Sequence, residues 1–133
     1  MSWTDIGRGL NVFDTEPVEG RSKWLDSPQD VLAFATSGED VSDVVVIARG
    51  GTTTFVAPAL SLGVRGVLTL QGGVESHLGI VSREFGIPCI VGVSFTEGRE
   101  TERGETVPED GTLLRLDTSG VPDGLVQAGG TPS

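Results

Sequence analysis

The hydrophobic and polar positions between residues 44 and 93 alternate between short apolar runs and longer amphipathic stretches. The apolar runs are VVVIA (44–48), VRGVLTL (64–70) and PCIVGV (88–93). Runs of this length that are rich in β-branched residues are typical of strands covered on both faces. The stretches between them, 52–63 and 76–86, predict helices. The order strand, helix, strand, helix, strand indicates a parallel β–α unit, with a site at the carboxyl ends of its strands.

The helix expected over 76–86 has clear start and stop signals. Ser76 is a suitable N-cap residue. Leu78, Val81 and Phe85 recur at spacings of three and four, which predicts a buried stripe. Gly86 fits the left-handed position that follows a helix.

The flanking segments carry other patterns. Residues 1–26 alternate weakly and predict one or two short strands, and Ser27 with Pro28 marks a helix start. After Gly98, two Asp-Gly pairs stand between short alternating runs, which predicts antiparallel hairpins. We therefore expect one α/β domain over 7–127, a flexible N-terminus over 1–6 and a disordered tail over 128–133.

Composition narrows the classes of function. The 133 residues suit one domain, and nine basic against nineteen acidic side chains leave a net charge of −10. This charge disfavours nucleic acid and anionic lipid as partners. No apolar run is long enough to span a membrane, and no basic-then-apolar leader begins the chain. The single cysteine indicates a reducing, cytoplasmic setting.

The only histidine, His77, follows a glycine pair at the start of the second expected helix. Gly72 and Gly73 allow the backbone to approach a ligand closely. The unpaired N–H groups and the positive dipole end of the helix favour an anion there and keep the imidazole neutral. A neutral ring nitrogen can attack a phosphoryl group while the amides face the incoming charge. The alternative is an ordinary surface histidine beside a common strand-to-helix turn.

The stretch GGVESHLGIVSREFGIPCIVG (72–92) resembles the signature of the mobile domain of phosphoenolpyruvate (PEP)-utilising enzymes. This is the swivelling phosphohistidine domain of the pyruvate phosphate dikinase and phosphoenolpyruvate synthase family. The likeness covers roughly residues 7–127 and implies a three-layer β/β/α fold with a central, partly parallel sheet and a small antiparallel β layer. The signature positions kept here are Gly72, Gly73, Ser76, His77, Ile80, Arg83, Glu84, Gly86, Ile87, Pro88 and Gly92.

The resemblance also implies roles for individual residues. In this family a histidine accepts a phosphoryl group on a ring nitrogen, and the domain swings between two partner active sites. His77 is then the phosphorylated residue. Gly72, Gly73 and Ser76 hold the phosphate, and Thr53 contributes from the start of the helix expected over 52–63.

Glu75 departs from the signature, which has threonine two places before the histidine. A carboxylate there would repel a phosphohistidine by about 1 kcal/mol or more. It could instead hydrogen-bond the imidazole and raise its nucleophilicity, or point into solvent.

The length of 133 residues leaves no room for an ATP-grasp domain or a PEP-binding barrel. We therefore expect the phosphocarrier subunit of a split phosphotransferase, which binds no cofactor itself. A separate ATP-grasp-like, nucleotide-binding partner or a PEP- or acceptor-binding partner would then hold ATP or PEP with Mg²⁺. The alternatives are a non-catalytic binding or regulatory module that keeps the fold, and an enzyme of another kind.

Other distinctive residues favour structural roles. We expect Arg83 to stabilise the helix end or to pair with an acidic neighbour, and Cys89 to be a packed, inert thiol. Trp3 and Trp24 are expected to cap the sheet, and 97–105 to be a solvated loop. One His and one Cys make a structural metal site improbable.

Overall fold

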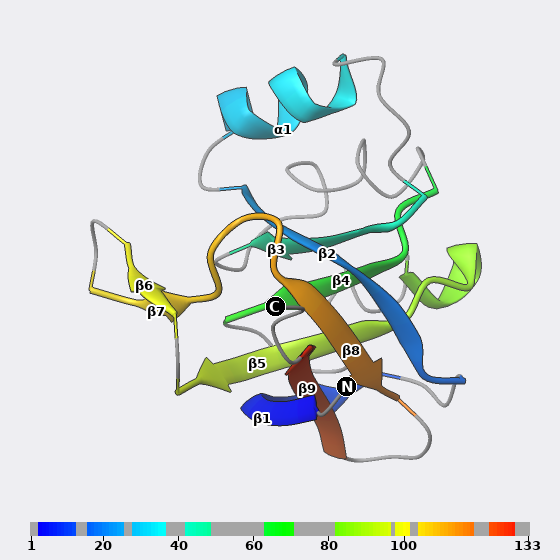
Figure 1. Cartoon of the computed structure of the whole chain (residues 1–133). Coiled ribbons are helices and arrows are strands. Elements are labelled where there is room, and N and C mark those ends of the chain that lie inside the picture. Colours follow the sequence, from blue (N-terminus) through cyan, green and yellow to red (C-terminus); the bar gives the residue numbers. More distant parts are fainter. Residues whose placement is uncertain are drawn as a thin grey trace.

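The computed structural model describes residues 3–12, 16–25, 28–36, 42–48, 63–70, 82–96, 98–101, 104–118 and 123–129. Most of these residues are in strands (Figure 1). The elements are β1 (Trp3–Asn11), β2 (Val18–Leu25), α1 (Pro28–Ala35), β3 (Val44–Ala48), β4 (Gly66–Thr69), β5 (Cys89–Phe95), β6 (Arg99–Glu100), β7 (Thr106–Val107), β8 (Leu113–Asp117) and β9 (Asp123–Gly129).

Seven strands form one mixed sheet that closes as a barrel, in the order β1-β5-β4-β3-β2-β8-β9. The pairs β2–β3, β3–β4 and β4–β5 are parallel, which confirms the parallel unit that the sequence predicts. The antiparallel strands β8, β9 and β1 close the barrel between β2 and β5. The mixed sheet agrees with the expected α/β class.

The parallel strands are buried on both faces because two apolar clusters cover them. All five residues of β3 are buried, and they alternate between the clusters. Val45 and Ile47 point into the barrel and meet residues of β8, β9 and β1; we call this cluster the inner core. Val44, Val46 and Ala48 belong to the outer core, against which Phe34 of α1 packs. Figure 1 accordingly shows α1 outside the barrel, beyond β2 and β3.

The small sheet β6–β7 is an antiparallel hairpin inserted between β5 and β8. Its first strand lies in the segment 97–105 that was expected to be a solvated loop, and β7 directly follows that segment. It projects on the side where β3, β4 and β5 end (Figure 1). Val107 is fully buried in the inner core, so it anchors the hairpin to the barrel.

Three expectations about the flanks need correction. The strand β1 begins at Trp3 and pairs with β9, whose last residue is Gly129. The paired strands thus extend beyond the expected domain limits of 7 and 127. The pair Asp123-Gly124 lies inside β9 and makes no turn, because it pairs with Leu10 and Gly9 of β1.

The helix predicted at Pro28 is confirmed as α1. Residues 52–62 of the helix expected over 52–63 and residues 76–81 of that expected over 76–86 lie outside the described residues. Among the helices of the described ranges, none has the length and apolar character needed to cross a membrane.

Two paired glycines make room for a large side chain inside the barrel. Gly9 of β1 pairs with Gly124 of β9, beside a register shift in the β1–β5 ladder. A Cβ on Gly124 would lie 2.9 Å from Ile90 Cδ1, and one on Gly9 would lie 2.6 Å from the Val91 carbonyl oxygen. A larger residue at position 9 therefore requires backbone movement, and one at position 124 requires the Ile90 side chain to shift.

We expect Gly9→Ala to lower the free energy of unfolding by about 1–3 kcal/mol, the usual cost of overpacking. The neighbouring Arg8 is exposed, so Arg8→Ala should stay within about 0.5 kcal/mol of the parent chain. Urea unfolding measures both variants. A neutral Gly9→Ala would show that β1 does not approach β5 this closely.

Candidate functional site

The carboxyl ends of the parallel strands lie at one edge of the barrel. β3 ends at Ala48 and β4 at Thr69, and the ladder pairs these two residues. The next N–H along β4, that of Leu70, donates to the Ala48 carbonyl oxygen at 3.1 Å. The chain therefore leaves the sheet toward 49–62 and toward 71–81 at two adjacent points.

The residues predicted to form the site belong to these two segments. Thr53 follows β3, whereas Gly72, Gly73, Glu75, Ser76 and His77 follow β4. All six lie outside the residues that the structure describes. Both segments nevertheless start from the edge at which parallel β–α units carry their sites.

The turn before β8 brings a carboxylate to the end of β2 that the sequence analysis did not single out. Asp110 Oδ1 accepts a hydrogen bond from the Trp24 N–H at 2.8 Å. Asp110 Oδ2 also lies 3.5 Å from Lys23 Nζ. The Asp-Gly signal correctly marks a turn at Gly111, whose φ is 87°. This turn joins β7 to β8, which belong to different sheets, so it is not the predicted hairpin.

Trp24 itself is 7% exposed and packs in the inner core, which confirms its structural interpretation. The side chain of Trp3 is outside the described part of the chain.

The helix that leads into β5 ends as the sequence predicts. Gly86 has a φ of 70°. Its N–H donates to the Arg83 carbonyl oxygen at 3.1 Å, and the Ile87 N–H donates to that of Ser82 at 2.9 Å. These two bonds form a Schellman motif, in which glycine takes the left-handed position. The stop signal at Gly86 is thus confirmed.

Phe85, by contrast, was expected in the buried stripe of this helix and is 53% exposed. The prediction was wrong because Phe85 is the last helical residue before the left-handed turn, where the backbone leaves its helical path. Helical spacing no longer describes which side of the chain is covered there.

Arg83 has a structural contact, as expected, although its described partner is neither acidic nor part of the helix end. Its Nη2 donates to the Val12 carbonyl oxygen at 2.9 Å, across 71 positions of the sequence. This bond ties the last helical turn to the end of β1. The arginine that the family signature has at this position therefore has a structural role in this chain.

Cys89 is fully buried at the start of β5. Burial raises the pKa of its thiol to about 11, and the neighbouring Ser82 hydroxyl offsets only part of that increase. A thiol reacts as the thiolate, so Cys89 is unreactive near neutral pH. The structure confirms the expectation of a packed, inert thiol.

The comparison with known proteins agrees with this architecture. The sequence profile of the family described as "PEP-utilising enzyme, mobile domain" matches residues 40–119, which contain both site segments and every strand from β3 to β8. The chain therefore belongs to this family of mobile domains.

Curated relatives carry three kinds of name. The chain is 32% identical over 107 residues to a rifampicin phosphotransferase of Streptomyces sviceus and 33% identical over 94 residues to a phosphoenolpyruvate synthase of Pyrococcus furiosus. It is 34% identical over 99 residues to a phosphoenolpyruvate-protein phosphotransferase of Mycoplasma genitalium. These matches cover 78%, 70% and 70% of this chain but only 11%, 11% and 17% of the relatives. The chain thus corresponds to one part of each relative.

Because the pKa of Cys89 is raised, the free energy of unfolding should vary with pH in the alkaline range. Between its ordinary value of 9.0 and about 11, the thiol stays protonated in the folded chain and ionises in the unfolded chain. The unfolded state then binds fewer protons, so stability falls as the pH rises through this window, by at most about 1.4 kcal/mol per pH unit.

Urea unfolding at several pH values, compared with Cys89→Ala, measures this effect. The stability advantage of the parent chain over Cys89→Ala should shrink from pH 9 to 11 and stay constant below pH 8. A difference that does not change with pH would show that the thiol is solvated.

Proposed function

We propose that this chain is a phosphocarrier that accepts a phosphoryl group on His77 and passes it to an acceptor. The observation that carries the proposal is the family match, which spans residues 40–119 and so includes the only histidine of the chain. The order of the chain supports it, because His77 follows a parallel strand at the carboxyl edge of the barrel. Three kinds of relative carry phosphotransferase or phosphoenolpyruvate synthase names, which supports the same chemistry.

The proposed step is a displacement at phosphorus. A neutral ring nitrogen of His77 forms the N–P bond, and the bond from phosphorus to the donor oxygen breaks, so its electron pair leaves with the donor. The proton on the other ring nitrogen can pass to solvent. Backbone amides after Gly73, together with Ser76 and Thr53, would neutralise the charge on the phosphoryl oxygens. The reverse displacement by an acceptor oxygen completes the transfer.

The donor and acceptor sites belong to partner proteins in this proposal. Each relative is at least several times longer than the matched region, so the remainder of those chains has no counterpart here. We propose a separate ATP-grasp-like or PEP-binding subunit that holds the nucleotide or PEP with Mg²⁺. We also propose that the chain acts in the cytoplasm. The three-layer β/β/α arrangement belongs to the same proposal and is supported by the packing of Phe34 of α1 against the outer core.

One specific feature favours a second candidate, a binding or regulatory module that keeps the fold without phosphotransfer. Glu75 stands where the family signature has threonine, and its negative charge disfavours an adjacent phosphoryl group. The two candidates differ in whether the folded chain promotes phosphorylation of its histidine.

The single histidine allows this difference to be measured without a partner. Phosphoramidate phosphorylates imidazole chemically, and intact mass with acid treatment counts the acid-labile groups added. If amides stabilise the developing charge, the folded chain should react at least about 10-fold faster than the urea-unfolded chain, a difference of ~1.4 kcal/mol in the barrier. His77→Ala should gain no acid-labile group. Equal or slower reaction of the folded chain would favour the non-catalytic module.

The role of Glu75 can be tested in the same assay. If its carboxylate acts by repulsion, Glu75→Thr should speed phosphorylation about 5-fold or more, the equivalent of ~1 kcal/mol. Glu84→Thr removes the same charge from an exposed position in the helical turn 82–85 and serves as the control. A slower Glu75→Thr variant would show that the carboxylate assists the ring instead.

A further inference from the structure

Strand β5 contains a β-bulge opposite β1. The register of the β1–β5 ladder shifts between Arg8 and Leu10. Across that shift, Gly9 alone faces two residues of β5, Gly92 and Val93. Gly92 has a φ of 63°. A glycine in the left-handed conformation at the first position of a bulge defines the G1 type, so position 92 favours glycine.

The bulge changes the face on which β5 presents its side chains. Residues two positions apart share a face in a regular strand. Val91 nevertheless packs in the outer core, whereas Val93 packs in the inner core. Phe95, two positions further, also packs against the inner core. The bulge thus directs the last part of β5 toward the barrel interior.

The bulge is level with the point at which the chain leaves β4. β4 pairs with β5 up to Leu68, which lies opposite Ile90. Two residues further, the same register places Leu70 opposite Gly92. On its other side β4 stays bonded to β3 up to Leu70, whose N–H donates to the Ala48 carbonyl oxygen at 3.1 Å. Among the described strands, pairing on the two sides of β4 therefore ends at different levels.

The bulge at Gly92 accounts for this difference, because a bulge bends its strand and interrupts regular pairing. β5 continues beyond the end of β4 toward the β6–β7 hairpin (Figure 1). Extended backbone at Gly92 would offer β4 a partner beyond Leu68 and would favour keeping the chain after Leu70 in the sheet. The left-handed residue removes that partner where the chain continues toward His77.

We propose that Gly92 is a positioning residue of the phosphoryl site. Its conformation ends the β4–β5 ladder and so fixes the point from which the segment with Gly72, Gly73 and His77 leaves the barrel. Bulges are frequent at barrel rims and beside active sites, where they end pairing or re-aim a side chain. The inference rests on the proposed phosphocarrier function and adds to it a residue that acts through the backbone.

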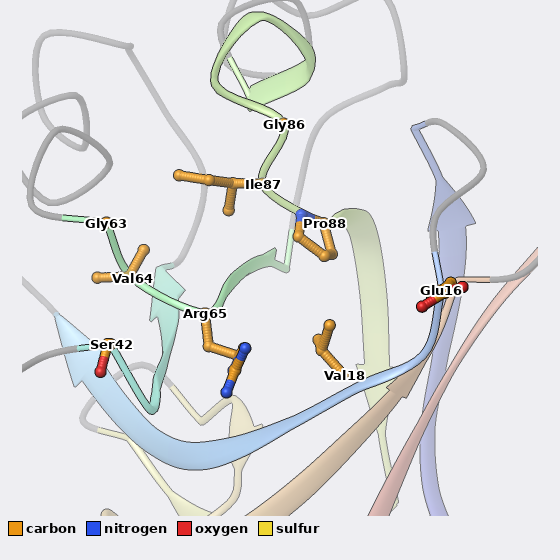
Figure 2. Close-up of a pocket in the computed structure, with 9 residues that line it drawn as sticks. All are labelled: Glu16, Val18, Ser42, Gly63, Val64, Arg65, Gly86, Ile87 and Pro88. Carbon is orange, nitrogen blue, oxygen red and sulfur yellow. The ribbon is translucent and has the colours of Figure 1, made fainter.

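Gly92→Ala and Gly63→Ala test the proposal as a matched pair. Gly63 has a φ of 82° and lies at the opposite, amino edge of the barrel, where it lines a pocket (Figure 2). Both substitutions force alanine to a positive φ, so both lower stability. In the phosphoramidate assay, Gly92→Ala should lose at least about 3-fold of the rate advantage of the folded chain, because misplaced groups lose catalysis. Gly63→Ala should keep that advantage.

The pH profile and a rescue variant separate positioning from stability. In Gly92→Ala, the pH of half-maximal rate should move toward that of the urea-unfolded chain, since the imidazole moves away from the helix dipole. Gly92→Asn should recover most of the lost rate, because asparagine tolerates the left-handed region. A parent-like rate and profile in Gly92→Ala, or an equal loss in Gly63→Ala, would overturn the proposal.

A second measurement needs no substitution at position 92. The ¹⁵N NMR spectra of the parent chain and His77→Ala should differ at the amides of Leu70 and Gly92 and agree at Gly63. An unchanged Gly92 amide would contradict the proposal, also where Gly92→Ala does not fold. This comparison involves no phosphorylation, so it can succeed even if the phosphocarrier function fails.

Discussion

The parallel ladder from β2 to β5 is the constraint on which the rest of the structure depends. Its strands are buried between the inner and outer cores, so their backbone N–H and C=O groups have no access to water and must pair with one another. This requirement holds Ala48 opposite Thr69 and brings the Leu70 N–H onto the Ala48 carbonyl oxygen. The two segments with candidate phosphate-binding residues therefore leave the barrel at neighbouring points.

The same ladder gives the molecule two chemically different edges. At the carboxyl edge the chain continues toward Thr53 and His77, and the Asp110 turn closes the end of β2. At the amino edge the entries to β3, β4 and β5 line a pocket together with Arg65. The height of the barrel separates these two edges.

Short sequence patterns predicted the elements well where the residue type itself favours one backbone conformation. The β-branched run 44–48 became β3 with the predicted bounds, and Gly86 occupies the left-handed position that its place after a helix indicated. Predictions that depended on tertiary contacts were less successful. Phe85 is exposed at the helix end. Asp123 and Gly124 begin strand β9, because pairing with β1 stabilises extended backbone there. The contact between Arg83 and Val12 joins positions 71 residues apart, beyond any local pattern.

The sequence by itself determined the chemistry offered by this protein: one imidazole after a glycine pair, one thiol in an apolar run, a net negative charge and a family signature. These depend on residue type and short spacing, which the chain carries before it folds. Only the tertiary structure decided that the mixed sheet closes into a barrel, that β1 and β9 seal it, and that Arg21 pairs with Asp43. Those outcomes come from contacts between distant residues, whose energies depend on burial and register rather than on sequence neighbours.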